Sequence, residues 1–419
     1  MHHVDVRHAF LNADVEEDIY MEVPAGYPVP REWQGVDCVV KLNRALYGLK
    51  QSSRQWHLAL KATLLGMGFR QLNKDQGIFV KWDGTEHTII LVWVDDMIIA
   101  SGDMDTVKRV KQGLRDKYDL EDNGEVKQVL GITIRRDRPR RLIYLSQEGH
   151  IAKVVKDAGV ADAYPTCVPM DVNLTLSKDG GRSPGFQFSE DDKSKYRSIV
   201  GQLVHIAHVT RPDIAYAVSG ISRYTNDPAP QHVTAAKAVA AYLKGTHSLK
   251  LRLGGGTLHD GAVTIAGYSD AGFSRCPDTR RSQSGYAFSV AGGTVSWSSI
   301  LQETPALSTT EAEYIGMANA GKEGQYLRHL LEEIGVVIHG PTQLFGDNMG
   351  AIALTKNPGH HDRTKHIDVR HHFIRWLVNA GHVKTEFVPS ERMTADVFTK
   401  PLDKGAFECN RDLLGIVAD

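Results

Sequence analysis

Two adjacent acidic residues interrupt an apolar, β-type run in the first quarter of the chain. Asp95 and Asp96 lie between Ile89–Val94 and Met97–Ala100, two stretches with the composition of buried strands. An unpaired carboxylate costs several kcal/mol when it leaves water, so two carboxylates between buried strands need a compensating cation. Mg²⁺ is one such cation, since it prefers a few carboxylates together with substrate phosphates. An exposed β-turn that carries two aspartates is an equally good interpretation of this stretch alone.

A third aspartate, Asp5, occupies a similar position after a short strand-like stretch near the start of the chain. The segments DVRHAFLNADVEEDIYMEVPAGY, LNRALYGLKQSSRQW and VWVDDMIIASGD resemble the reverse transcriptase palm of copia-type LTR retrotransposons. VLGITI and TRPDIAYAVSGISRY continue the resemblance through the thumb and the segment that follows it. The later segments YSDAGF, LSTTEAEY, GDNMGAIAL and ADVFTKPL are similar to the RNase H part of the same family, so the resemblance covers nearly the whole chain.

The resemblance implies a polymerase site that holds two Mg²⁺ (or Mn²⁺) ions. Asp5, Asp95 and Asp96 would be its catalytic carboxylates, and the backbone carbonyl of Val6 would lie beside them on the metal. Polymerase sites use such carboxylates to hold two metals about 3.5–4 Å apart.

Three further residues would form the nucleotide pocket on the same resemblance. Phe10 would screen the incoming sugar for a 2′-hydroxyl group, and Tyr47 and Gly48 would contact the nucleotide. The family usually carries Tyr or Phe two residues before the paired aspartates, where this chain has Trp93. An aromatic residue is retained there.

A second set of carboxylates lies in the last third of the chain. Asp270 ends the strand-like stretch from Ala262, and Asp347 ends another from Thr342. Asp396 lies in a short helical stretch that follows Val383–Pro389. With Glu311, these residues follow the order Asp, Glu, Asp, Asp that an RNase H fold uses to bind two magnesium ions around a scissile phosphate. Any one of these aspartates alone would more often be a turn or cap residue.

The glutamate of this set has a near neighbour. Ser308-Thr309-Thr310-Glu311 has the spacing of a capping box that opens a long helix ending near Gly335. We predict that Glu311 faces the sheet and is catalytic, because it matches the family position. Glu313 is expected to face solvent or to act as a cap.

A basic cluster forms the tip of a predicted β-hairpin between Gly131–Ile134 and Leu142–Leu145. A primer–template contact, a solvated hairpin tip and a nuclear-import signal are the three interpretations, of which we favour the first. The arginines of this cluster are Arg135, Arg136, Arg138, Arg140 and Arg141.

The histidines His360, His361, His366, His371 and His372 suggest a zinc site, but their spacing offers no closing cysteine pair. On the resemblance, Lys365 and His366 are more readily explained by a substrate contact or local packing. The four cysteines show no CxxC spacing, so the sequence indicates neither zinc nor a disulfide framework.

Composition limits the other function classes. The 419 residues include 42% hydrophobic and 24% charged residues, enough for several cores. The net charge of −1 gives no global attraction to nucleic acid, so binding would depend on local basic patches and metals. We expect no membrane segment and no signal peptide. The expected location is intracellular, either cytoplasmic in a virus-like particle or nuclear.

These observations predict a multidomain α+β or α/β protein with four parts. They are a reverse transcriptase palm (1–125), a thumb-like part (126–170), a linker with a helical connection (171–255) and an RNase H-like domain (256–419). The polar stretch Asp171–Lys195 is the expected linker. The family carries a fingers subdomain before the first catalytic aspartate, and this chain begins four residues before Asp5, so we expect the fingers to be missing and polymerisation to be impaired.

Two functions follow from the resemblance. The first is a retrotransposon RNA-directed DNA polymerase with RNase H activity, acting on an RNA template, a DNA primer, dNTPs and RNA–DNA hybrids. The second is a non-catalytic remnant that only binds nucleic acid.

Overall fold

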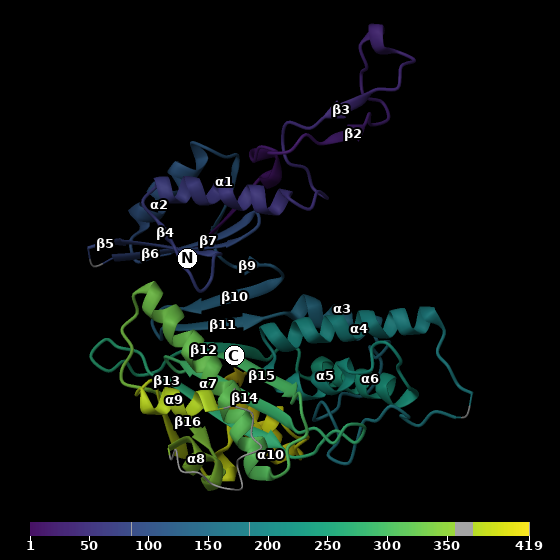
Figure 1. The fold of residues 1–419 in the computed structure, drawn as a ribbon, viewed down its shortest axis with the longest axis vertical. Helices are drawn as coiled ribbons and strands as arrows, with labels where there is room; N and C mark the ends of the chain where they lie inside the picture. Colours follow the sequence, from purple (N-terminus) through teal and green to yellow (C-terminus); the bar gives the residue numbers. More distant parts are fainter. Residues whose placement is uncertain (85, 184, 357–371, 419) are drawn as a thin grey trace. The chain divides into compact units, whose positions relative to one another are not determined.

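The computed structural model describes residues 1–84, 86–183, 185–356 and 372–418. The chain forms two compact units, Met1–Val129 and Leu130–Asp419, each of which mixes helices and strands (Figure 1). The mixed α/β class is therefore confirmed. The palm and thumb arrangement and the four domain boundaries stay predictions.

The first unit is built on a six-stranded sheet with the order β4-β5-β6-β7-β1-β8. Strands β6 and β7 form the predicted hairpin around the paired aspartates, and β1 pairs antiparallel with both β7 and β8. The strands are β1 (His2–Val6), β4 (Arg70–Gln71), β5 (Ile78–Asp83), β6 (Glu86–Trp93), β7 (Asp96–Ser101) and β8 (Leu120–Glu125), and the short β9 (Gln128–Val129) ends the unit.

Two helices of the first unit, α1 (Ser52–Gly66) and α2 (Met104–Arg115), cover the sheet with apolar side chains. The side chain of Asp103 accepts hydrogen bonds from the first-turn amides of α2, which explains where this helix begins. The core includes Trp56, Phe79 and Ile90, all essentially buried. Burial of these large side chains holds β6 and β7 in place beneath the helices.

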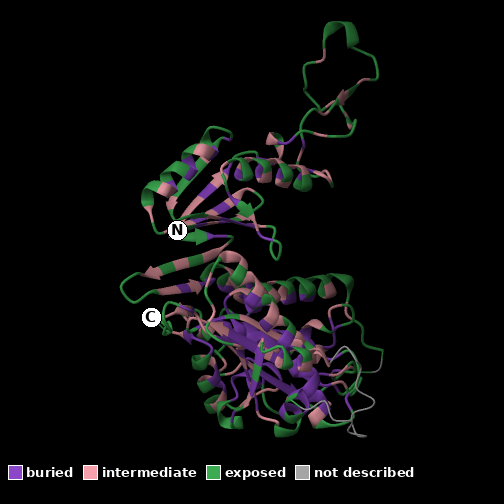
Figure 2. Cartoon of the chain, turned by 60° about the vertical axis from the view of Figure 1, so that its left-hand side comes forward, coloured by how far each residue is buried: buried purple, intermediate pink, exposed green. Residues whose placement is uncertain are grey.

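A two-stranded ribbon, β2 (Tyr20–Glu22) and β3 (Val39–Lys41), lies outside that sheet and is largely exposed (Figure 2). The first unit also contains the 3₁₀ turns η1 (Ala9–Asn12) and η2 (Arg31–Trp33).

The second unit contains the predicted basic hairpin, formed by β10 (Ile132–Asp137) and β11 (Leu142–Ser146). Strand β12 (Lys250–Gly254) pairs with β11, and β18 (Ile416–Val417) pairs with β12. The guanidinium carbon of Arg135 lies 4.6 Å from the centre of the Tyr144 ring.

Helices occupy much of the stretch 171–255, in which we expected a helical connection. They are α4 (Glu190–Val209), α5 (Ala215–Ser222) and α6 (Pro230–Gly245), with the 3₁₀ turn η3 (Pro212–Ile214) before α5; α3 (Glu148–Asp157) precedes this stretch, and we call α3 to α6 the helical region. The predicted linker is too long, because α4 already begins at Glu190. Ser189 caps it by accepting a hydrogen bond from the Asp192 amide, and three acidic residues follow in the first turn, where the helix dipole favours negative charge.

The last sheet has the order β15-β14-β13-β16-β17, with β13, β16 and β17 parallel to one another. Helix α7 (Thr309–Ile334) packs against β13, β14 and β16. Because β13 and β16 are parallel neighbours, residues at their carboxyl ends meet at one edge of the sheet. The strands are β13 (Ile265–Gly272), β14 (Gln283–Val290), β15 (Gly293–Leu301), β16 (Thr342–Gly346) and β17 (Val383–Phe387). The other elements are α8 (Met349–Lys356), α9 (Phe373–Asn379), η6 (Ser390–Arg392), η7 (Thr394–Phe398) and α10 (Lys404–Leu413).

One hydrophobic core joins the helical region to this sheet. It contains buried side chains from α4, α5 and α6 together with residues of η7 and α10. The indole N–H of Trp297 on β15 donates to the carbonyl of Ala207 on α4 at 2.8 Å. Arg211 and Asp213 form a fully buried ion pair, 2.7 Å from Nη2 to Oδ2, and the Tyr242 hydroxyl donates to the same carboxylate.

Candidate functional site

The first unit brings Asp5, Asp95 and Asp96 together. One carboxylate oxygen of each lies within 4.8 Å of the others. Asp5 on β1 pairs in register with Asp96 at the start of β7, and Asp95 lies in the tight turn that precedes Asp96. Directly opposed residues on antiparallel strands place their Cβ atoms about 4.5–5.5 Å apart, which explains the proximity of Asp5 and Asp96.

The turn that carries Asp95 is held from two sides. Val94 has φ of 56°, an unfavourable conformation for a β-branched residue. The indole N–H of Trp56 on α1 donates to the Val94 carbonyl at 2.6 Å, and the Val6 amide donates to the Asp95 carbonyl at 3.0 Å. These bonds to β1 and α1 keep the strained turn in place and with it the position of Asp95.

The three carboxylates are crowded electrostatically. Burial, followed by the charges of Asp95 and Asp96, raises the pKa of Asp5. The imidazole of His3 pairs with Asp96, with Nε2 2.7 Å from Oδ1. Without a cation, Asp5 thus charges less readily than an ordinary aspartate.

The residues predicted for the nucleotide pocket lie close to this group. The rings of Phe10 and Tyr47 are 4.4 Å apart at an angle of 45°. Burial and then the charges of Asp95 and Asp5 raise the pKa of the Tyr47 hydroxyl, so this residue lies within electrostatic reach of the carboxylates. Gly48 has φ of 101°, a backbone conformation that favours glycine. Val6 is buried, and its role on a metal stays a prediction.

The second unit brings together Asp270, Glu313 and Asp347, again with one oxygen of each within 4.8 Å. Asp270 lies on β13, Asp347 directly follows the parallel strand β16, and Glu313 lies in the second turn of α7. A Cβ atom at Gly316 would lie 3.4 Å from the Asp270 carbonyl, so the helix approaches β13 closely at this point.

The structure places the two glutamates differently from our expectation, while their catalytic roles stay predictions. Glu311, which we predicted to face the sheet, uses its Oε2 atom to accept a hydrogen bond from the Leu307 amide at 2.7 Å. Glu313, which we predicted to face solvent or cap the helix, is the one that joins Asp270 and Asp347. Exposure does not separate them, since Glu311 is 8% and Glu313 7% exposed.

The physical reason lies in the capping box. Ser308 accepts from the Glu311 amide at 3.1 Å, which makes Glu311 the N3 residue, and an N3 glutamate reaches back to the start of the helix. Glu313 shares a helix face with the buried residues Met317 and Ala320, at the spacing of a stripe that faces a sheet. Because Ile315 and Ala318, at the same spacing from Glu311, are buried as well, this pattern in the sequence does not distinguish the two glutamates.

Asp396 adjoins the second cluster through charge and through its own neighbours. Its Oδ2 atom lies 2.8 Å from Nζ of Lys400, while its Oδ1 atom is buried without a hydrogen-bond partner in the described structure. Thr399, the residue before Lys400, donates its hydroxyl hydrogen to Asp270. Ser390 donates to Oδ2 of Asp347 at 2.8 Å. Sequence reasoning missed these three supporting side chains. Thr399 and Ser390 meet Asp270 and Asp347 only in the fold, whereas the spacing of Lys400, four residues after Asp396, could have indicated that pair.

The pKa shifts show how strongly the second cluster repels negative charge. Burial first, then Asp270 and Asp347, raise the pKa of Glu313 to about 10. Burial and Asp270 raise the pKa of Asp396 to about 6, against the opposing effect of Lys400. Burial lowers the pKa of Lys400, but the hydrogen bond to Asp396 and the charge of Asp270 outweigh it, so the net shift is upward. A cation in this cluster would relieve the repulsion.

Only some of the other predicted nucleic-acid contacts lie among the residues that the structure describes. Lys365 and His366 lie outside the described residues, as do His360, His361 and His371 of the suggested zinc site. His372 is described, and its Nδ1 atom lies 3.0 Å from the Tyr314 hydroxyl. On the basic hairpin, Arg138, Arg140 and Arg141 are exposed, and Arg140 lies 3.7 Å from Asp137.

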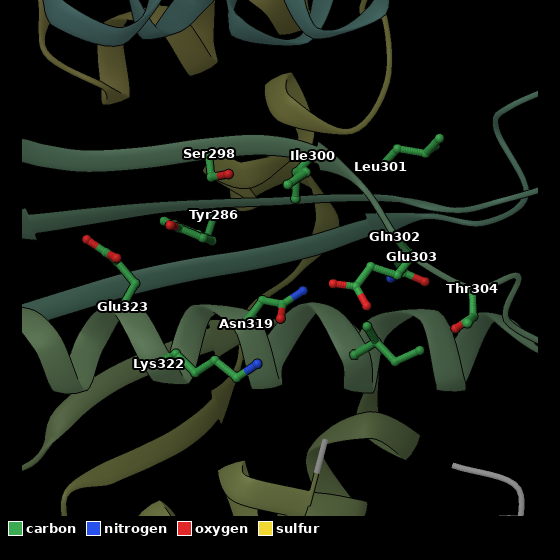
Figure 3. A pocket seen from close by; sticks show the side chains of 11 residues that line it. Tyr286, Ser298, Ile300, Leu301, Gln302, Glu303, Thr304, Asn319, Lys322 and Glu323 are labelled. Atoms are coloured by element: carbon green, nitrogen blue, oxygen red, sulfur yellow. The ribbon is translucent and has the colours of Figure 1, made fainter. Parts of the chain in front are cut away.

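A cavity of about 330 Å³ lies between β15 and α7, bordered by Tyr286, Gln302 and Lys322 among others (Figure 3). None of the seven predicted carboxylates borders it. Among the described residues, no helix is both long and apolar enough to cross a membrane.

The chain resembles known proteins over most of its length. Residues 1–172 match the family model described as reverse transcriptase (RNA-dependent DNA polymerase). The retrovirus-related Pol polyprotein from transposon TNT 1-94 of Nicotiana tabacum is 37% identical over 99% of this chain and 30% of its own length. This chain thus spans less than a third of that relative.

Two further comparisons differ in strength. The putative transposon Ty5-1 protein YCL074W of Saccharomyces cerevisiae is 33% identical over 74% of this chain and 97% of its own length. Among solved structures, the N-terminal RNase H domain of Rv2228c from Mycobacterium tuberculosis, fused to maltose-binding protein, covers 36% of this chain and 98% of its own at 16% identity. Its TM-score of 0.24 is too low to support an argument about function.

Proposed function

Because the chain belongs to the reverse transcriptase and RNase H region of copia-type retrotransposon Pol polyproteins, we propose that it carries two phosphoryl-transfer sites, one in each unit. The first would extend a DNA primer on an RNA template, and the second would hydrolyse the RNA strand of an RNA–DNA hybrid. The observation that carries the proposal is the presence of two separate carboxylate triads, Asp5–Asp95–Asp96 and Asp270–Glu313–Asp347.

Both triads suit divalent cations such as Mg²⁺ or Mn²⁺. Each offers three carboxylate oxygens within 4.8 Å of one another, and hard cations prefer oxygen ligands. In the second site, the unpartnered Oδ1 atom of Asp396 is a fourth candidate ligand. When bound, paired metal ions stabilise the attacking and leaving oxygens of an in-line displacement at phosphorus.

The chain's own residues would orient the reactants. In the first site, the adjacent, tilted rings of Phe10 and Tyr47 would limit the space beside the carboxylates, where the sugar of a nucleotide would lie. In the second site, Thr399 and Ser390 hold the orientations of Asp270 and Asp347 by hydrogen bonds. Carboxylate side chains must be held rigidly in this way if they are to position a phosphate.

The alternative function is a remnant that binds nucleic acid without catalysis. The buried carboxylates of the second site favour an enzyme, because a cluster that raises the pKa of Glu313 to about 10 has a cost in stability that Lys400 offsets only in part. A remnant freed from catalysis would gain stability by losing such a cluster.

A pair of variants in the full chain tests the proposal. We expect primer extension by the parent chain to be impaired; Asp95→Asn should abolish what extension remains and leave hybrid cleavage unchanged, while Glu313→Gln should abolish cleavage and leave the remaining extension unchanged. Both assays need Mg²⁺ or Mn²⁺ and a chelator control. If the parent chain neither extends nor cleaves, or if each variant behaves like the parent, the proposal fails.

A further inference from the structure

Two adjoining pockets of the second unit form a groove bordered by Lys400, the partner of Asp396. The first is a pocket of about 60 Å³ that contains Arg223 and Arg275, and the second contains Lys400. The two share Met170, Tyr216 and Pro401, so their linings are continuous. We call this feature, defined by the three basic residues and the three shared ones, the basic groove.

The groove is assembled from separate parts of the chain. Arg223 follows α5 in the helical region, and Arg275 follows β13 five residues after Asp270. Lys400 follows η7 and pairs with Asp396. The groove therefore connects the helical region directly with the second carboxylate cluster.

Within the part of the chain that the structure describes, no carboxylate forms an ion pair with either arginine. Among the described residues, Arg275 forms no ion pair, and both arginines are exposed. Arg223 donates Nε to the Gly220 carbonyl at 3.3 Å and lies over the Tyr224 ring at 5.7 Å. The charges of both arginines act on the Tyr216 hydroxyl, whose pKa is nevertheless raised by burial.

The acidic residues nearby are already engaged. Asp213, which borders the second pocket, is held by Arg211 at 2.7 Å. Asp278 accepts hydrogen bonds from the Lys178 amide and the Tyr224 hydroxyl. Two guanidinium groups at one pocket repel each other unless an anion lies between them, and their planar forks match phosphate oxygens.

We propose that the basic groove binds the phosphodiester backbone of the RNA–DNA hybrid next to the scissile phosphate. The proposal rests on the function proposed above, because the hybrid reaches the groove from the carboxylate cluster. A pocket of about 60 Å³ has room for a few water-sized groups, which suits a phosphate better than a stacked base. The helical region thereby contributes to substrate binding as well as to the core.

The test compares two double variants of the full chain that remove the same charge. Arg223→Gln/Arg275→Gln should weaken hybrid binding in EDTA by roughly tenfold and reduce the slope of log affinity against log salt by about 1 to 2, because two phosphate contacts are lost. With Mg²⁺ the KM for the hybrid should rise while kcat changes little. Arg197→Gln/Lys237→Gln, two exposed positions on α4 and α6, is the matched control.

The outcomes separate the two proposals. If the parent cleaves the hybrid and the groove variant keeps the affinity and salt slope of the control, the groove assignment is wrong and the nuclease assignment stands. If the parent neither binds nor cleaves the hybrid, both are wrong. Pyrophosphate binding that disappears in the groove variant, with hybrid affinity unchanged, would identify a free-anion site and overturn the backbone assignment. Equal thermal stability of the two double variants excludes misfolding as the cause.

Discussion

Nζ of Lys400 lies 2.8 Å from Oδ2 of Asp396, so the second carboxylate cluster carries its own positive charge. The lysine compensates part of the repulsion among Asp270, Asp347 and Asp396. It leaves Oδ1 of Asp396 without a partner. The pair therefore keeps one carboxylate oxygen available while it restrains the other.

Replacing this lysine should change metal binding and stability in opposite directions. In Lys400→Met the cluster has one more uncompensated negative charge, so the metal-free protein should lose about 1 to 3 kcal/mol of unfolding free energy. The Mn²⁺ concentration that gives half-maximal thermal stabilisation should fall severalfold. Lys400→Arg should restore parental behaviour, and Lys404→Met, an exposed change on α10, should have no effect. A metal titration identical to that of the parent would contradict this role.

Substitutions of the two glutamates at the start of α7 should separate the loss of hybrid cleavage from the loss of the helix cap. Glu313→Gln should reduce hybrid cleavage by at least about 100-fold, because it removes a charge from the group that would hold the metals. Glu311→Gln keeps a side-chain acceptor for the Leu307 amide and should retain cleavage. Glu311→Ala should cost about 0.5–2 kcal/mol of unfolding free energy through loss of the cap. Loss of cleavage in Glu311→Gln, with Glu313→Gln active, would restore our original assignment.

The metal-free protein should become less stable as pH rises. The pKa of Glu313 is about 10 in the folded protein and 4.5 for an ordinary glutamate in an unfolded chain, so between these values the folded state binds more protons than the unfolded state. Unfolding free energy then decreases with pH in that window. We expect Glu313→Gln to gain about 1 to 3 kcal/mol relative to the parent between pH 5 and pH 8 in EDTA, measured by urea unfolding. Glu311→Gln is the control and should follow the parent.

The helical region and the last sheet should unfold together. Asp213→Asn removes one partner of the buried Arg211–Asp213 pair and should cost about 3–5 kcal/mol. The shared core joins α4, α5 and α6 to η7 and α10. On heating, cleavage activity should therefore be lost at the same temperature as the circular dichroism signal of the helices. Asp227→Asn breaks an exposed pair with Arg182 and should cost less than about 1 kcal/mol. Retained nuclease activity above the melting point of the helices would show that the two parts are independent.

Local sequence patterns determined most of the elements that carry the sites. The apolar run around Asp95 and Asp96 predicted a hairpin, and β6 and β7 form it, because strand pairing across a tight turn depends on neighbouring residues. The capping box predicted the start of α7 at Ser308 for the same reason. The family resemblance supplied the expectation that Asp5, which lies far earlier in the sequence, belongs with this pair.

The tertiary structure decided which side chains meet. Glu311 and Glu313 lie two residues apart on one helix, and only the packing of α7 against β13 turns Glu313 toward Asp270. Thr399 acquires Asp270 as a partner because η7 packs on β13 and β14, a contact between segments more than a hundred residues apart, whereas Lys400 pairs with Asp396 only four residues before it. Helix caps and hairpins depend on short-range geometry, which a sequence displays directly. The orientation of a helix face depends on the sheet that it covers, and that information exists only once the chain has folded.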